Sequence, residues 1–389
     1  MNLQTLTDAS IIPNGDLGVE SAEQTVTTTQ SWRKLLRPLK IGELEIGFPI
    51  VQAALSGYSD WPMRLLARRH GASYSLCEVM LDQFLVCLKD REKNRHFLFN
   101  SADEQPVAGQ LMGAEPAQFA LGARRLAEAG FAVIDINFGC PVKKVLGRCR
   151  GGFHLSQPKV ALEIVERTRE MVPSHIPVTV KMRRGIDDTA ESRDHFFEIL
   201  DGAFSAGISA VTVHGRTVKQ RYNGPSNWQF LKEVKQHLGS RTMLGSGDLF
   251  SAADCLRMIQ QTGVDGVTVA RGAIGNPWIF QQCLTLASGE PLPQPPRTGQ
   301  QRNVLEEHWR LAESLYGPLR TGPLLRKFGI KYSASHPDYL SIRGEFGKVR
   351  TSADWFGVLD RWYRDDIPGV FPPPEIHRVQ GSTCNDQCG

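Results

Sequence analysis

Residues 132–141 read AVIDINFGCP, and they set a pattern that the rest of the chain repeats. The first part is an apolar run interrupted by Asp135 and Asn137, and a Gly-Cys-Pro turn ends it. A short continuous run of this kind is typical of a strand buried on both faces, as in a parallel sheet. An amphipathic segment follows at 157–172, so this part of the chain predicts a strand, a loop and a helix in that order.

The same alternation recurs on both sides of this stretch. The apolar runs are 48–55, 74–80, 106–112, 132–138, 177–182, 210–214, 242–245 and 266–270. The helix-like segments are 60–70, 82–91, 115–129, 157–172, 189–206, 227–238, 251–262 and 275–287. Eight strand–helix units predict an α/β fold, a (β/α)8 TIM barrel, and a doubly wound open sheet is the alternative.

Polar or reactive residues gather where these runs end. They are Glu78, Gln110, Asn137 with Cys140, Lys181 with Arg183, His214 with Arg216, Asp248 and Arg271. Parallel barrels build their active sites at the carboxyl ends of the strands. The pattern therefore predicts an enzyme whose site lies on that rim.

The chain has 389 residues with ordinary globular composition, and we expect four parts. These are a leader at 1–35, the barrel at 36–290, a helical domain at 301–366 and a tail at 367–389, with a Pro- and Gly-rich linker before the helical domain. A net charge of +4 does not by itself indicate nucleic-acid binding, so any basic surface must come from local clustering.

The eight cysteines are scattered among core-like segments, and no secretory signal precedes them, so we expect reduced thiols in a cytoplasmic protein. No apolar run has the length of a membrane helix. Cys384 and Cys388 are weak evidence for a metal site, and we expect no metal.

Several motifs together resemble the tRNA-dihydrouridine synthase family, particularly its DusB-like branch. Residues 134–145 (IDINFGCPVKKV) resemble the family signature. In order along the chain, 57–60 (GYSD), 109–111 (GQL), 180–183 (VKMR), 213–217 (VHGRT), 247–248 (GD) and 271–280 (RGAIGNPWIF) resemble further family segments. The similarity spans about residues 40–287, and a weaker echo covers 301–364.

The resemblance implies an FMN-dependent reduction of the C5–C6 double bond of uridine in tRNA, with NADPH or NADH as reductant. Cys140 would be the acid that protonates C5, which requires a protonated thiol and suits an ordinary thiol pKa near ~8.5. We expect a monomer that binds tRNA and does not associate with a membrane.

The resemblance also implies the binding residues. Cofactor contacts would come from Ala54, Leu55, Ser56, Gln110, Lys181, His214, Ser246, Gly247, Asp248, Ala270 and Arg271. RNA contacts would come from Lys143, Lys144, Arg148, Arg150, Arg216, Arg326, Lys327 and Lys331. Phosphate contacts of this kind give salt-dependent affinity without sequence information.

Four segments depart from the family pattern. Residues 53–56 read Ala-Ala-Leu-Ser in place of Ala-Pro-Met-Ala, and Phe153 and His154 are bulky where the family has small residues. Ser246 and Ala270 replace Asn and Gly. These departures raise the alternative of a divergent paralogue that binds RNA with altered or lost reductase activity. A separate alternative is an FMN barrel reductase of a small pyrimidine, against which the basic loops and the helical segment argue.

Overall fold

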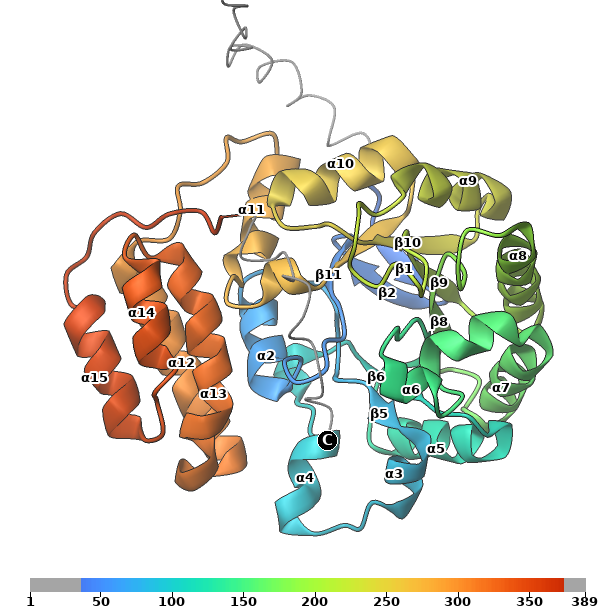
Figure 1. Cartoon of the computed structure of the whole chain (residues 1–389), viewed down its shortest axis with the longest axis horizontal. Coiled ribbons are helices and arrows are strands. Elements are labelled where there is room, and N and C mark those ends of the chain that lie inside the picture. The colour runs from blue at the N-terminus through green and yellow to red at the C-terminus, as the bar shows by residue number, and fades with distance from the viewer. Residues whose placement is uncertain (1–35, 374–389) are drawn as a thin grey trace, which may run out of the picture.

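The computed structural model describes residues 36–373, so the expected leader and the end of the expected tail lie outside the described part. Within these residues the chain forms a closed ring of eight parallel strands, which confirms the predicted barrel (Figure 1). The ring closes where the last strand, β11, pairs with the first, β3. The strands are β3 (Ile50–Gln52), β4 (Ser75–Leu76), β6 (Val107–Met112), β7 (Val133–Phe138), β8 (Val178–Arg183), β9 (Ala210–His214), β10 (Thr242–Ser246) and β11 (Gly266–Val269).

Strands β6 and β7 are buried along their whole length. Every residue of β6 and β7 is buried, which explains why these segments are nearly continuous apolar runs. The register aligns polar residues of neighbouring strands: Gln110 with Asp135, Asn137 with Lys181, and Arg183 with His214. Their side chains therefore meet in layers inside the carboxyl end of the barrel.

The expected strand at 74–80 is two short strands, β4 and β5 (Met80–Leu81), which both pair with β6. Between them the backbone N–H of Glu78 donates to the carbonyl of Ser59 at 3.2 Å. This hydrogen bond takes Glu78 out of the sheet and ties it to the loop after β3.

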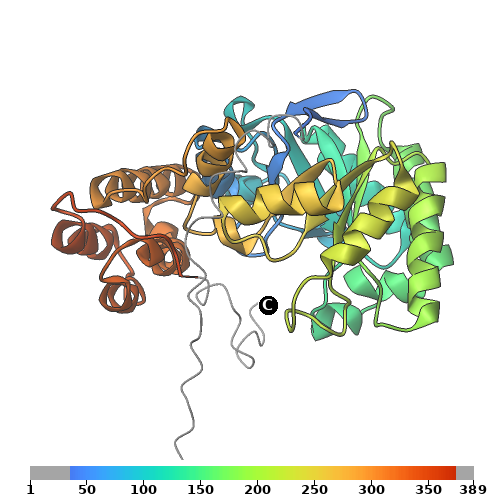
Figure 2. The same cartoon turned by 90° about the horizontal axis from the view of Figure 1, so that it is seen from above.

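Helices cover the outside of the ring, close to the predicted bounds (Figure 2). They are α2 (Trp61–Arg69), α3 (Asp82–Cys87), α5 (Pro116–Glu128), α7 (Pro158–Met171), α8 (Ala190–Ser205), α9 (Trp228–Leu238), α10 (Ala252–Thr262) and α11 (Trp278–Ala287). Side-chain caps start several of them: Asp60 accepts the N–H of Met63, and Ser251 forms a capping box with Asp254.

The segment 82–91 is shorter than expected because the backbone is already extended at Leu88. A loop with η2 (Glu92–Asn94) and α4 (Arg95–Leu98) follows.

A hairpin of β1 (Leu39–Ile41) and β2 (Leu44–Gly47) closes the amino end of the barrel. Leu39, Ile41 and Ile46 are buried in one cluster with interior residues of the strands, such as Val51 and Leu76. This apolar plug leaves the carboxyl end as the open end of the barrel.

Four helices follow the barrel and lie to one side of it, in orange and red in Figure 1. They are α12 (Thr298–Tyr316), α13 (Pro318–Tyr332), α14 (Tyr339–Phe346) and α15 (Ser352–Trp362). Fully buried aromatic rings hold them together, with Trp309 and Trp355 at a centroid distance of 5.5 Å and Phe346 and Trp355 at 4.9 Å. We call these helices the helical module.

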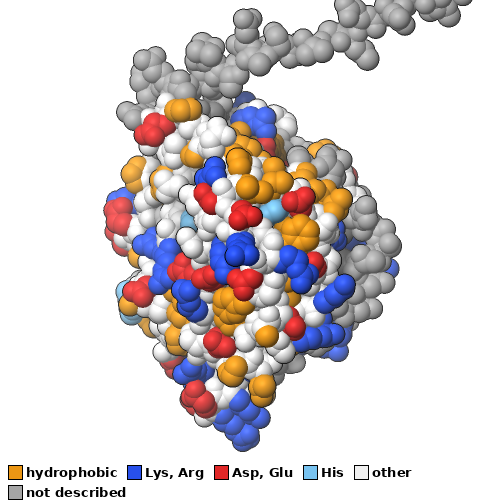
Figure 3. All heavy atoms as spheres, turned by 90° about the vertical axis from the view of Figure 1, so that its left-hand side faces the viewer, with side chains coloured by type: hydrophobic (Ala, Val, Ile, Leu, Met, Phe, Trp, Pro, Cys, Tyr) orange, Lys and Arg blue, Asp and Glu red, His pale blue; other side chains and the backbone are white. Residues whose placement is uncertain are grey.

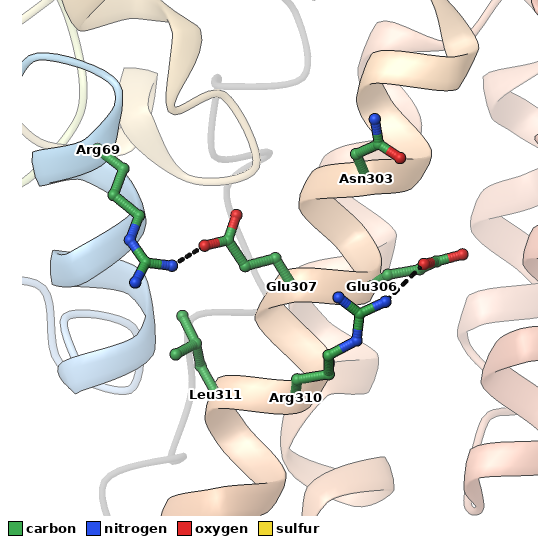
Figure 4. A pocket seen from close by; sticks show the side chains of 6 residues that line it. All are labelled: Arg69, Asn303, Glu306, Glu307, Arg310 and Leu311. Atoms are coloured by element: carbon green, nitrogen blue, oxygen red, sulfur yellow. Dashed lines mark hydrogen bonds and ion pairs between the residues drawn. The ribbon is translucent and has the colours of Figure 1, made fainter.

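The helical module joins the barrel mainly through α12, α13 and α2. Arg69 of α2 pairs with Glu307 of α12 across a shallow groove that also contains Asn303, Arg310 and Leu311 (Figure 4). The hydroxyl of Tyr316 donates to the Asp60 carboxylate at 3.0 Å, and the Lys327 amino group lies 5.2 Å from the centroid of the Tyr58 ring. The module is therefore fixed against the loop that follows the first barrel strand.

Candidate functional site

The predicted cofactor residues gather at the carboxyl ends of the barrel strands. Ala54, Leu55 and Ser56 follow β3, Gln110 lies in β6, Lys181 in β8, and His214 and Ser246 end β9 and β10. Gly247 and Asp248 follow β10, and Ala270 and Arg271 follow β11. Cys140 comes two residues after the end of β7, in the same rim.

A buried hydrogen-bond network shapes the floor of this rim. The Gln110 amide donates to the Asp135 carboxylate at 2.7 Å and accepts from the Asn137 amide at 2.8 Å. Asn137 in turn accepts the N–H of Gly139 at 2.9 Å. Burial raises the pKa of Asp135 to about 6, although Thr179 and Gln110 donate hydrogen bonds to its carboxylate. The network fixes the turn that leads directly to Cys140.

Lys181 lies beside this turn. A Cβ added at Gly139 would be 3.3 Å from the Lys181 amino nitrogen. Burial and the neighbouring Arg183 guanidinium lower the pKa of Lys181 to about 8, while Asp135 acts in the opposite direction. Desolvation therefore raises the cost of the ammonium charge, and an anionic group bound at this place would reduce that cost.

Burial, followed by the charges of Arg183 and Lys181, holds the pKa of the His214 imidazole well below its ordinary value. Its Nε2 lies 3.4 Å from an Arg216 terminal nitrogen, and a guanidinium can only donate a hydrogen bond. This contact favours the tautomer that carries its proton on Nδ1.

The buried Arg216 forms an ion pair with the partly exposed Asp248, just after the ends of β9 and β10. One Arg216 terminal nitrogen lies 2.7 and 2.8 Å from the two Asp248 carboxylate oxygens, and the side chain also donates to the carbonyl of Gly224. Asp248 accepts the N–H of Ser226 at 2.7 Å, which holds the loop after β9. The Asp248 carboxylate, which we expected to contact the cofactor, therefore also has protein partners that connect the surrounding loops.

Gly247 lies between these groups in a backbone conformation with φ of +114° that favours glycine. A Cβ at this position would be 2.4 Å from the Ser226 hydroxyl and 2.7 Å from His214 Cδ2. The backbone can thus pass close to His214 because it carries no side chain.

Residues outside the expected set also line the rim. Tyr222 lies between two guanidiniums, with Arg183 at 5.6 Å and Arg271 at 5.0 Å from its ring centroid. Asn137 and Arg183 were expected at the rim, but not among the cofactor contacts. Asn137 donates to Gln110, and the Arg183 guanidinium donates to the carbonyl of Gly139 at 2.9 Å. Tyr222 comes from a loop whose course the sequence does not fix.

The basic residues expected to contact RNA fall into two groups. Lys143, Lys144 and Arg148 are exposed in and just after α6 (Lys143–Leu146), beside Cys140. Arg150 and Arg216 are buried, with exposed fractions of 7% and 3%, because Gln83 and Asp248 respectively bind their guanidiniums. The expectation that these two arginines contact RNA is therefore not supported.

The remaining expected RNA contacts lie in α13. Arg326, Lys327 and Lys331 are partly buried, and Lys327 and Lys331 lie where this helix meets the barrel. Burial and the charges of Arg343 and Arg271 lower the pKa of Lys331, which indicates a gathering of cations between the barrel rim and the module. The outer face of the module is different, because acidic, basic and apolar side chains are interspersed there (Figure 3).

The bulky residues after the cysteine have defined places. His154 is buried in η4 (Gly151–Ser156), and its Nε2 lies 2.8 Å from the carbonyl of Gly113. Phe153 is half-buried next to it.

Neither an apolar helix long enough to cross a membrane nor a cluster of metal-ligating side chains is present between residues 36 and 373.

Solved structures with similar folds are distant in sequence. The structure of a 2-naphthoyl-CoA reductase complex has a TM-score of 0.52 at 11% identity and covers 67% of this chain and 53% of that one. Histamine dehydrogenase from Rhizobium sp. 4-9 has a TM-score of 0.52 at 14% identity and covers 72% and 51%. These similarities support the barrel fold and nothing more specific.

Sequence relatives are closer. A probable tRNA-dihydrouridine synthase of Mycobacterium tuberculosis is 32% identical over 357 residues, covering 89% of each chain. The tRNA-dihydrouridine synthase B of Pseudomonas aeruginosa is 32% identical over 313 residues, covering 80% of this chain and 92% of its own. The model of the family described as Dihydrouridine synthase (Dus) matches residues 51–352. With the cysteine, lysine and histidine assembled on one barrel rim, the chain belongs to the dihydrouridine synthase family.

Proposed function

We propose that this protein is a tRNA-dihydrouridine synthase that reduces the C5–C6 double bond of uridine with FMN and NAD(P)H. The observation that carries the proposal is the approach of Lys181 to the Gly139-Cys140 turn at the open end of the barrel. A cation and a thiol at the same opening suit this reaction. The cation would stabilise the negative charge of the reduced flavin ring, and the thiol would donate one proton to uracil. Family membership over most of the chain supports the same conclusion.

The residues present fit FMN. Lys181 supplies a cation whose charge is poorly solvated, and His214 supplies a neutral N–H donor. Gln110 retains one amide hydrogen after donating to Asp135, which leaves a donor for a ring acceptor. Arg271 would hold the phosphate through its positive charge, and Gly247 would shape the turn beside it, since its backbone passes close to His214 without a side chain.

The chemistry divides between the cofactor and the protein. Reduced FMN, when bound, would supply the hydride that adds to C6 of the uracil ring. Cys140 would hold a proton at Sγ and give it to C5, and the thiolate would take a proton back from solvent. Lys181 would stabilise negative charge at the edge of the reduced ring system, as a fixed cation does in a water-poor site.

For tRNA we propose a surface made of Lys143, Lys144 and Arg148 on the barrel, continued by Arg326 and Lys331 at the module. In this proposal an RNA strand that contacts both groups would cross the open rim and bring one base above Cys140. The base must leave its stack to reach the site, as other base-modifying enzymes require. We further propose a cytoplasmic monomer, with the free cysteines of residues 36–373 consistent with a reducing compartment.

The test begins with the purified protein and its absorbance spectrum, followed by an assay of dihydrouridine in uridine-containing tRNA. We expect bound flavin, NAD(P)H-dependent product in tRNA, and little product from free uridine. Cys140→Ala should abolish product formation and keep the flavin, whereas Cys149→Ala, an exposed thiol in the same loop, should remain active. A protein that takes up no FMN would contradict the proposal. Product from free uridine alone would favour the small-pyrimidine alternative.

A further inference from the structure

The loop that follows Cys140 folds back against it. The N–H of Gly152 donates to the carbonyl of Cys140 at 3.1 Å. At Gly151, where φ is +59°, an added Cβ would lie 2.8 Å from the Cβ of Cys140. The position of Cys140 therefore depends on where residues 150–152 are held.

Arg150 is the residue that attaches this loop to its surroundings. Its guanidinium donates to the Gln83 side-chain carbonyl at 2.8 Å, and its backbone N–H donates to the carbonyl of Val145 at 3.2 Å. Asp82 is 1% exposed, accepts the N–H of Gln83 at 2.7 Å, and is close enough for the charge of Arg150 to lower its pKa, although burial raises that pKa overall. The loop is thus connected to the start of α3, a segment far away in sequence.

His154 makes a second attachment on the same side. Burial lowers the pKa of its imidazole, and Nε2–H donates to the Gly113 carbonyl at 2.8 Å, since a carbonyl can only accept. Gly113 in turn lies against Asp82, since a Cβ there would be 1.9 Å from the Asp82 carboxylate. Asp82, Gln83, Arg150 and His154 therefore form one contiguous polar cluster, which we call the loop clamp.

We propose that Arg150 is a positioning residue that acts through the loop clamp to hold Cys140 in place. The inference rests on the proposed function in one respect, namely that Cys140 is the proton donor. A buried guanidinium bound to Gln83 is not available to a phosphate, which separates Arg150 from the exposed Arg148 two residues earlier. A small displacement of a reacting group lowers rates about 100-fold, so the clamp affects turnover without touching substrate.

The first test measures the reactivity of Cys140 directly. The purified protein is treated with iodoacetamide, and the alkylation rate of the peptide containing Cys140 is followed by mass spectrometry. Arg150→Met should raise this rate about fivefold or more, because a loosened loop opens more often. Arg148→Met, which removes the same charge from the exposed part of the loop, should leave the rate unchanged.

The second test separates positioning from RNA binding. Arg150→Met should lower kcat with little change in the KM for tRNA, whereas Arg148→Met should mainly raise the KM. Arg150→Lys should restore part of kcat, because an ammonium can still reach Gln83. Gln83→Ala removes the acceptor at an exposed position and should reproduce the alkylation change even if Arg150→Met folds poorly.

A Cys140 alkylation rate within about twofold of wild type, or slower, in both Arg150→Met and Gln83→Ala would overturn the proposal. This outcome with an active wild type would leave the proposed function intact. An inactive wild type whose Cys140 still reacts faster after Arg150→Met would instead reject the function and support the clamp.

Discussion

Replacing Lys181 with methionine should stabilise the protein and inactivate it. The pKa of Lys181 is lowered from 10.5 to about 8, chiefly by burial. Since one pKa unit corresponds to about 1.4 kcal/mol, the folded protein carries a cost of about 3 kcal/mol to keep this ammonium charged. Lys181 also stabilises the Asp135 carboxylate, which offsets part of the gain. We therefore expect Lys181→Met to raise the free energy of unfolding by about 1–3 kcal/mol at neutral pH.

The stability difference between Lys181→Met and the wild type should depend on pH, and the lowered pKa of Lys181 gives the direction of this dependence. Below pH 8 the lysine is protonated in both the folded and the unfolded chain, so the full cost is present in the wild type. Between pH 8 and 10.5 the folded lysine is neutral while the unfolded lysine is still charged, so the wild type regains stability as pH rises. The advantage of Lys181→Met should therefore be largest below pH 8 and shrink by about 2 kcal/mol by pH ~9.5.

Urea unfolding of flavin-free protein, followed by tryptophan fluorescence at two pH values, measures this difference. Lys159→Met is the matched control, since Lys159 is exposed on α7 and its loss should change stability by less than about 0.5 kcal/mol. Product formation should fall about 100-fold in Lys181→Met, because a fixed charge at the reacting ring is lost. A variant no more stable than wild type at neutral pH, or an advantage independent of pH, would refute the reasoning.

Three further changes test other parts of the structure. Glu104→Gln should lower the free energy of unfolding by about 3–5 kcal/mol in a urea titration, since it leaves the buried Arg64 charge without its carboxylate partner. Gly247→Ala should weaken FMN binding in a fluorescence titration, because the new methyl group would lie 2.7 Å from His214 Cδ2. Arg148→Met should reduce the slope of log affinity against log salt by about 1 in tRNA binding, because one phosphate contact is lost.

Each of these changes has an outcome that contradicts it. An unchanged urea midpoint for Glu104→Gln would mean that the ion pair with Arg64 contributes little. Wild-type flavin affinity in Gly247→Ala would place the phosphate away from this turn. An unchanged salt slope for Arg148→Met would remove that residue from the proposed RNA surface.

Much of the fold, and the gathering of the expected residues at one rim of the barrel, was predictable because the signals are local. The apolar run at 132–138 and its repeats predict buried parallel strands, and strand polarity then places Cys140, Lys181 and His214 at one end. The split of 74–80 into two strands was not predictable. It is accompanied by a hydrogen bond from Glu78 to Ser59, a tertiary contact with the loop after the first barrel strand that periodicity does not reveal.

The sequence by itself determined the barrel, its active rim and the family, because periodicity and ordered motifs are properties of the chain in one dimension. Only the tertiary structure decided which arginines face solvent. Arg148 and Arg150 lie in one basic loop, yet the second is buried because Gln83, 67 residues away, binds it. Arg216 is likewise bound by Asp248, 32 residues away. Burying a guanidinium is costly unless hydrogen-bond acceptors or carboxylates surround it, and these partners are distant in sequence and come together only in the folded protein.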